Sequence, residues 1–132
     1  PLDRLIVDTM PIKGPLRGIL SAHERYPHAD WLALPCDMLF LQEATLQLLL
    51  KAVRRASKPQ LTLFGSPAQP EPLVAYYPAA VLAATLQRYQ QPTHTDFSLK
   101  GLLKQVGTTY LPVTSAMQPQ FRNWNEPGAG RF

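Results

Sequence analysis

The 132-residue sequence contains a single cysteine and few charged side chains. One cysteine excludes an internal disulfide framework and is compatible with a reducing cytoplasm, where we expect the protein to be located. Charged residues make up 17% and hydrophobic residues 45%, which argues against a disordered chain and predicts a globular one. The length fits one domain, and we expect residues 1–132 to form that single domain.

Several patterns that mark common classes of function are also missing. No apolar run approaches the length of a transmembrane helix, so no membrane span is expected. The three histidines do not form a zinc-binding spacing with Cys36, and neither a Gly-x-Ser-x-Gly elbow nor a Walker loop is present. The net charge of +4 comes from scattered basic residues without interleaved aromatics, which argues against a nucleic-acid partner. The remaining candidates for chemistry are carboxylates, amides and backbone groups.

Strand-like and helix-like segments alternate along the chain. Short apolar runs predict strands at 5–7, 31–34, 60–64, 73–77 and 109–113. Apolar residues at helical spacing predict helices at 15–25, 43–56, 78–90 and 99–106. Ser98 is the expected N-cap of the last helix and Gly107 its C-terminal stop, while 65–72 is expected to be a Pro-rich loop. This alternation predicts an α/β fold with three layers.

The segment Leu34-Pro35-Cys36-Asp37-Met38 is the most informative one. A buried strand that leads to Asp37 brings a carboxylate to the carboxyl edge of an α/β sheet, where ligands of open sheets bind. Asp8 follows the run 5–7 and is expected at the same edge. One carboxylate suits a Mg²⁺ ion that carries a phosphate substrate, and the other suits the nucleotide or a metal-bound water. Two ordinary strand-end aspartates are the alternative interpretation.

Two further segments are candidates for binding. In Gly14-Pro15-Leu16-Arg17-Gly18, glycine lets the backbone approach a ligand and the helix start favours anions, although a tight packing contact at Gly18 explains it equally. Asn123 and Asn125 lie two residues apart in a segment, 121–125, that is expected to be extended. They would then point to one side and could read polar groups of a substrate. Turn-forming asparagines are the alternative.

Taken in order, these segments resemble the molybdenum cofactor guanylyltransferases and their nucleotidyltransferase relatives. The order and the intervening lengths agree over nearly the whole chain. The matching segments are the strand before Asp8, Gly14-Pro15-Leu16-Arg17-Gly18-Ile19-Leu20-Ser21, Leu34-Pro35-Cys36-Asp37-Met38, Pro72-Leu73-Val74-Ala75-Tyr76-Tyr77-Pro78 and Phe121-Arg122-Asn123-Trp124-Asn125-Glu126-Pro127.

The resemblance implies a Rossmann-like nucleotidyltransferase fold, a three-layer sandwich, and an activity. The implied reaction is the Mg²⁺-dependent transfer of GMP from GTP to the phosphate of molybdopterin, with release of pyrophosphate. CTP remains open as the donor, and molybdoenzymes or other proteins of cofactor biosynthesis are implied as further partners. The implied site residues are Asp37 as catalytic residue and metal ligand, Asp8, Gly14, Gly18 and Asp37 for the nucleotide, and Asn123 and Asn125 for the acceptor.

One departure from the family pattern limits these expectations. The N-terminal strand and Gly-rich triphosphate loop of the family have no counterpart in the 132 residues, so we expect an N-terminally incomplete domain that is inactive alone. Two other interpretations stay open: a non-catalytic nucleotide- or partner-binding module of the same fold, and a sugar-phosphate nucleotidyltransferase.

Overall fold

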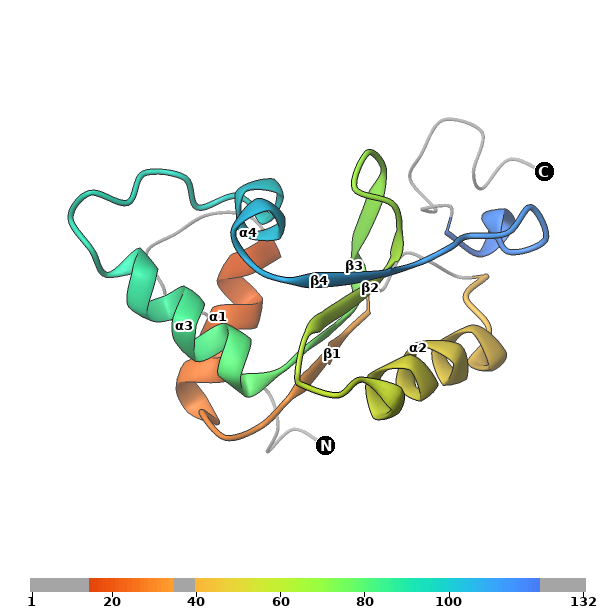
Figure 1. The fold of residues 1–132 in the computed structure, drawn as a ribbon, viewed down its shortest axis with the longest axis horizontal. Coiled ribbons are helices and arrows are strands. Elements are labelled where there is room, and N and C mark those ends of the chain that lie inside the picture. Colours follow the sequence, from red (N-terminus) through yellow and green to blue (C-terminus); the bar gives the residue numbers. More distant parts are fainter. Residues whose placement is uncertain (1–14, 35–39, 122–132) are drawn as a thin grey trace.

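A computed structural model of the protein describes residues 15–34 and 40–121 (Figure 1). The helices are α1 (Pro15–Arg25), α2 (Glu43–Arg55), α3 (Ala79–Tyr89) and α4 (Leu99–Gln105), followed by the 3-10 helix η2 (Gln118–Phe121). The strands are β1 (Trp31–Ala33), β2 (Leu61–Gly65), β3 (Pro70–Tyr77) and β4 (Thr108–Leu111). Within the described ranges, every helix is too short or too polar to cross a bilayer.

The four strands form one mixed sheet in the order β1-β3-β2-β4. β3 is antiparallel to both of its neighbours, and β4 is parallel to β2. Three of the strands therefore run in the same direction, and their last residues, Ala33, Gly65 and Leu111, lie toward one end of the sheet. We call this end the carboxyl edge and the opposite end the amino edge.

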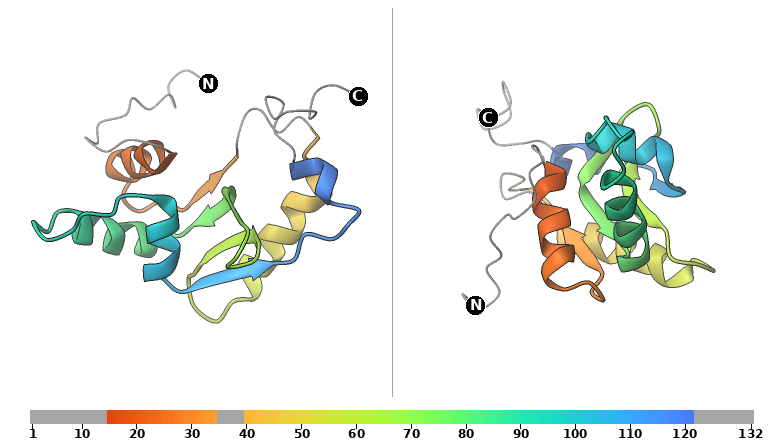
Figure 2. Two further views of the ribbon diagram at one scale, coloured as in Figure 1. Left: turned by 90° about the horizontal axis from the view of Figure 1, so that it is seen from above. Right: turned by 90° about the vertical axis from the view of Figure 1, so that its left-hand side faces the viewer.

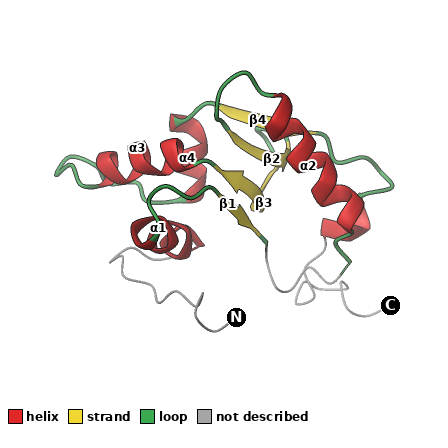
Figure 3. Ribbon diagram, turned by 90° about the horizontal axis from the view of Figure 1, so that it is seen from below, coloured by secondary structure: helices red, strands yellow, loops and turns green. Residues whose placement is uncertain are grey.

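Alternating side chains place helices on both faces of the sheet (Figure 3). On one face, β2 and β3 contribute Leu61, Leu63, Ala75 and Tyr77 to a core that also contains leucines of α1, α3 and α4. On the other face, Phe64 and Val74 pack with Leu49 of α2, and Phe121 of η2 lies against this second core. The structure thus confirms the expected three-layer α/β arrangement.

The helices begin and end close to the predicted positions. The hydroxyl of Ser98 accepts a hydrogen bond from the Gly101 N–H at 3.0 Å, as predicted for the N-cap of α4. The predicted glycine stop is wrong in its mechanism, because Gly107 has no left-handed backbone. The last helical residue is instead Gln105, and the C-cap that follows it, Val106, adopts an extended conformation.

The hairpin between β2 and β3 is tighter than the prolines suggested. β3 begins at Pro70, so the predicted loop 65–72 shrinks to the turn 66–69, closed by two backbone hydrogen bonds between Ser66 and Gln69. Proline fits the first residue of a strand because the missing N–H is not needed there. The pairing of β2 with β3 also shifts register between Leu63 and Phe64, where the ladder of paired residues is irregular.

A second correction concerns Phe121. It closes the 3-10 helix η2, so at this residue the segment that was expected to be extended is helical. The remainder of that segment and the predicted strand at 5–7 lie outside the described residues.

Candidate functional site

The carboxyl edge brings together the ends of segments that the sequence singled out. Asp37 follows the last residue of β1 by four positions, and α1 returns to β1 through the short connection 26–30. The two elements run in opposite directions, so the start of α1 lies on the side where β1 ends (Figure 1). Of the predicted nucleotide-binding residues, Gly18 is described: it lies exposed in the first turn of α1.

The other predicted site residues lie outside the described part of the chain, and their roles stay predictions. These residues are Asp8, Gly14, Asp37, Asn123 and Asn125.

A cavity of about 610 Å³ opens at the carboxyl edge. Its walls come from the β2–β3 hairpin, from the residues that follow β4 and from η2. The lining residues are Gly65, Ser66, Gln69, Pro70, Glu71, Pro112, Val113, Gln118 and Phe121. The volume is typical of small-molecule sites. Amide, hydroxyl and carboxylate groups line it, and none of its described lining residues is basic. Apart from Phe121, which belongs to a segment that the sequence singled out, sequence reasoning missed these residues because they meet only when the hairpin and η2 are placed in space.

Gln120 joins the wall of this cavity to the start of α2. Its side chain is 8% exposed, and its Oε1 accepts hydrogen bonds from the Gln42 N–H at 3.1 Å and from the Thr45 hydroxyl at 2.5 Å. Gln42 is the N-cap of α2, but its own side chain makes no capping hydrogen bond. The next residue, Phe121, packs on Phe64 with 5.2 Å between ring centroids. Figure 2 shows η2 beside the start of α2.

At the amino edge, the carboxylate of Asp30 has a structural role. Asp30 accepts hydrogen bonds from the Tyr76 hydroxyl at 2.6 Å and from the Ala79 N–H at 2.7 Å. Ala79 is the first residue of α3, so Asp30 caps that helix from 49 positions away in sequence. Burial, together with the hydrogen bond to Asp30, raises the pKa of Tyr76 to about 12. These contacts explain Asp30 without a catalytic role.

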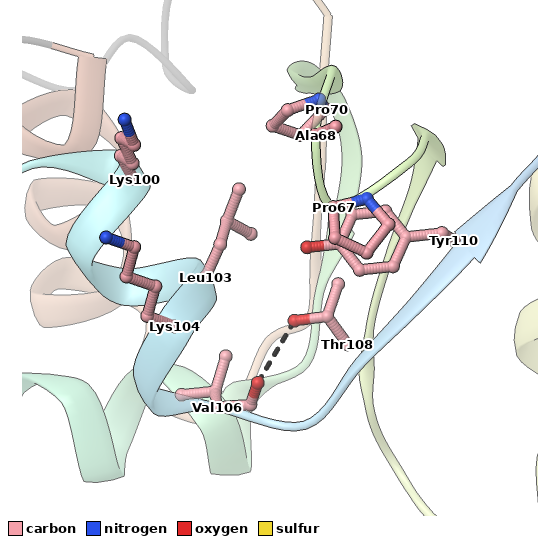
Figure 4. Close-up of a pocket in the computed structure, with 9 residues that line it drawn as sticks. All are labelled: Pro67, Ala68, Pro70, Lys100, Leu103, Lys104, Val106, Thr108 and Tyr110. Atoms are coloured by element: carbon pink, nitrogen blue, oxygen red, sulfur yellow. Dashed lines mark hydrogen bonds between the residues drawn. The ribbon is translucent and has the colours of Figure 1, made fainter.

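A second cavity, of about 620 Å³, lies between α4, β4 and the other side of the β2–β3 hairpin. Leu103 of α4 faces Pro67 and Tyr110 across it, while the ammonium groups of Lys100 and Lys104 lie at the α4 rim (Figure 4). This cavity is more apolar than the one at the carboxyl edge and contains none of the segments that the sequence singled out.

The described residues contain no cluster of three or more histidine, cysteine, aspartate or glutamate side chains that could hold a metal. His23 is buried in α1, and desolvation, followed by the nearby His28, lowers its pKa. Its Nδ1 has no hydrogen-bond partner. A buried imidazole of this kind indicates a packing role. The predicted metal ligand, Asp37, lies outside the described residues.

Comparison with known proteins places these features in a family. The profile described as "MobA-like NTP transferase domain" matches residues 3–108. The molybdenum cofactor biosynthesis bifunctional protein of Synechocystis sp. is 33% identical over 57 residues, which are 42% of this chain and 16% of that protein. The chain therefore spans about a sixth of the length of this curated relative.

Several solved structures share the fold. A protein from Aquifex aeolicus VF5 matches with a TM-score of 0.73 and 17% identity, over 92% of this chain and 62% of that one. Molybdopterin-guanine dinucleotide biosynthesis protein A from Archaeoglobus fulgidus matches with a TM-score of 0.64 and 22% identity, over 88% of this chain and 58% of that one. The family match covers most of the chain, so the protein belongs to the MobA-like NTP transferase domain family.

Proposed function

We propose that the protein transfers a nucleoside monophosphate, GMP from GTP, to the phosphate of molybdopterin and releases pyrophosphate. The observation that carries this proposal is the family match over residues 3–108, which contains both predicted aspartates and the segment after β1. A cavity of suitable size at the carboxyl edge supports it, because ligands of open α/β sheets bind at that edge.

The proposed reaction needs no protein nucleophile. An oxygen of the acceptor phosphate attacks the α-phosphorus of the nucleotide, a new P–O bond forms, and the bond to the bridging oxygen of pyrophosphate breaks. Both reactants are anions, so the site has to hold them in line and offset their repulsion. This explains why the described residues can lack a catalytic serine, cysteine or histidine arrangement.

A divalent ion, Mg²⁺ in our proposal, neutralises charge on the α-phosphate when it is bound. Asp37 would hold it, because carboxylate oxygens are the ligands that Mg²⁺ prefers. One or two protein carboxylates suffice, since Mg²⁺ completes its coordination with waters and substrate phosphates. The absence of a larger acidic cluster from the described residues is compatible with this arrangement.

Different segments of the chain would contact the two substrates. Asp8, Gly14 and Gly18 are proposed to contact the nucleotide, while Asn123 and Asn125 are proposed to contact the acceptor. η2 ends at Phe121, two residues before Asn123, and Phe121 lines the carboxyl-edge cavity. We therefore assign this cavity to the acceptor, because its amide and hydroxyl groups suit the hydrogen-bonding edges of a pterin.

The test is the Asp37→Asn variant of the complete natural protein, assayed for transfer from GTP and from CTP to molybdopterin. Transfer should fall by at least about a hundredfold, the scale of losing a group that stabilises transition-state charge, while thermal unfolding stays unchanged. Asp30→Asn is the matched control, because this carboxylate caps α3 at the amino edge. Transfer that survives in Asp37→Asn refutes the metal assignment. Nucleotide binding without any turnover in the wild type supports the binding module instead.

A further inference from the structure

The start of α2 depends on a side chain from far along the chain. The first N–H groups of a helix have no partner within the helix and need one from elsewhere. Glutamine is not a favoured N-cap residue, and Gln42 provides no side-chain cap for α2. Gln120, 78 positions later, accepts the Gln42 N–H and the Thr45 hydroxyl on a single oxygen.

Gln120 lies on η2, the short helix that forms part of the wall of the acceptor cavity. Gln118 and Phe121 line that cavity, and both lie on η2 with Gln120. Phe121 is anchored on the sheet through Phe64, whereas Gln120 anchors η2 to α2. The cavity wall is therefore held at two neighbouring residues, one by an aromatic contact and the other by two hydrogen bonds.

We propose that Gln120 is a positioning residue that sets the width of the acceptor cavity by tying η2 to the first turn of α2. This inference rests on the proposed function, because it takes the cavity as the acceptor site. Gln120 itself does not line the cavity, so it acts through Gln118 and Phe121. Its loss should weaken acceptor binding and leave nucleotide binding unchanged.

Four substitutions separate this role from general stability. Gln120→Leu has a similar shape but removes the accepting oxygen, and Thr45→Val removes one of the donors. Gln120→Glu keeps an oxygen that accepts from both donors, and Thr45→Ser keeps the hydroxyl. We expect Gln120→Leu and Thr45→Val each to weaken acceptor binding by roughly tenfold, the scale of one or two lost buried hydrogen bonds. Gln120→Glu and Thr45→Ser should keep acceptor affinity close to that of the wild type.

Asp30→Ala provides the matched control. It removes a long-range helix cap of the same kind, but from α3 at the amino edge. It should lower the melting temperature to a similar degree without changing the affinity for the acceptor. An equal loss of acceptor affinity in Asp30→Ala, or wild-type affinity in Gln120→Leu, overturns the proposal.

The measurement is an anaerobic titration of molybdopterin into the complete natural protein, with a parallel titration of GTP. It does not depend on turnover. A wild type that binds the acceptor without transferring nucleotide refutes the proposed reaction, while the comparison of variants still decides the role of Gln120. A wild type that does not bind molybdopterin refutes both.

Discussion

Gly65 is the position where a single methyl group should disturb the carboxyl edge most. Among the described residues it is the one with a positive φ, +112°, and as the last residue of β2 it directly precedes the turn of the β2–β3 hairpin. A Cβ added there would collide with the carbonyl oxygen of Gln69 and would lie 3.0 Å from the Cα of Pro70. Both contacts are with backbone, so neither can be relieved by rotating a side chain.

The expected cost of Gly65→Ala has two parts. An alanine held at this φ costs about 1–3 kcal/mol, and moving the turn away from the new methyl adds about 1 kcal/mol. We therefore expect a loss of about 2–4 kcal/mol in the free energy of unfolding, or roughly 10 °C in melting temperature for a domain of this size. Acceptor affinity should fall as well, because Gly65 and Gln69 line the carboxyl-edge cavity.

Gly107→Ala is the matched control for the thermal unfolding experiment. Gly107 has an ordinary φ, and its added Cβ would meet the end of the Gln60 side chain at 3.2 Å. The cost should stay below about 1 kcal/mol, because a side-chain amide can shift by a few tenths of an ångström. If Gly65→Ala melts within about 2 °C of the wild type, or no lower than Gly107→Ala, the strain argument is wrong.

Two other predictions concern the cores that support the site. Leu49 is fully buried and its neighbour Leu48 is 51% exposed, so urea unfolding should show a loss of about 2–5 kcal/mol for Leu49→Ala and less than about 0.5 kcal/mol for Leu48→Ala. Similar losses of unfolding free energy in the two variants would contradict the assignment of Leu49 to the buried face of α2 and Leu48 to its exposed face. Because burial lowers the pKa of His23, the unfolded chain binds its proton more readily, and stability should decline as the pH falls below the ordinary value of 6.5. Urea midpoints of His23→Leu should lose part of this pH dependence, and an unchanged slope would assign it to other groups.

The sequence predicted the elements well where the signal is local. The leucine spacing of α2 and the side-chain cap of Ser98 depend on residues within one or two turns, and the structure confirms both. The prolines near residue 70 led to the wrong prediction of a loop at 65–72, because a proline at the first position of a strand cannot be distinguished in sequence from one in a loop.

The site was less accessible to prediction because its contacts are distant in sequence. No local pattern indicates that Gln120 caps α2 or that Asp30 caps α3, since each pair is separated by 49 residues or more. From the sequence alone, Gln120 and Asp30 look like ordinary surface residues. The predicted ligands themselves, Asp37 above all, rest on the family motif and await the substitution experiments.

The position of β3 in the sheet also constrains the order in which the fold can assemble. β2 and β3 are joined by a four-residue turn, so their pairing closes quickly and locally. β1 pairs with β3, with Ala33 opposite Ala75 and Trp31 opposite Tyr77. These partners are more than forty residues apart in sequence, so β1 can pair only after β3 is available. The strand that leads to Asp37 is thus expected to dock late, onto a hairpin that has already formed. In a nascent chain, β1 could join the sheet only after β3 had left the ribosome.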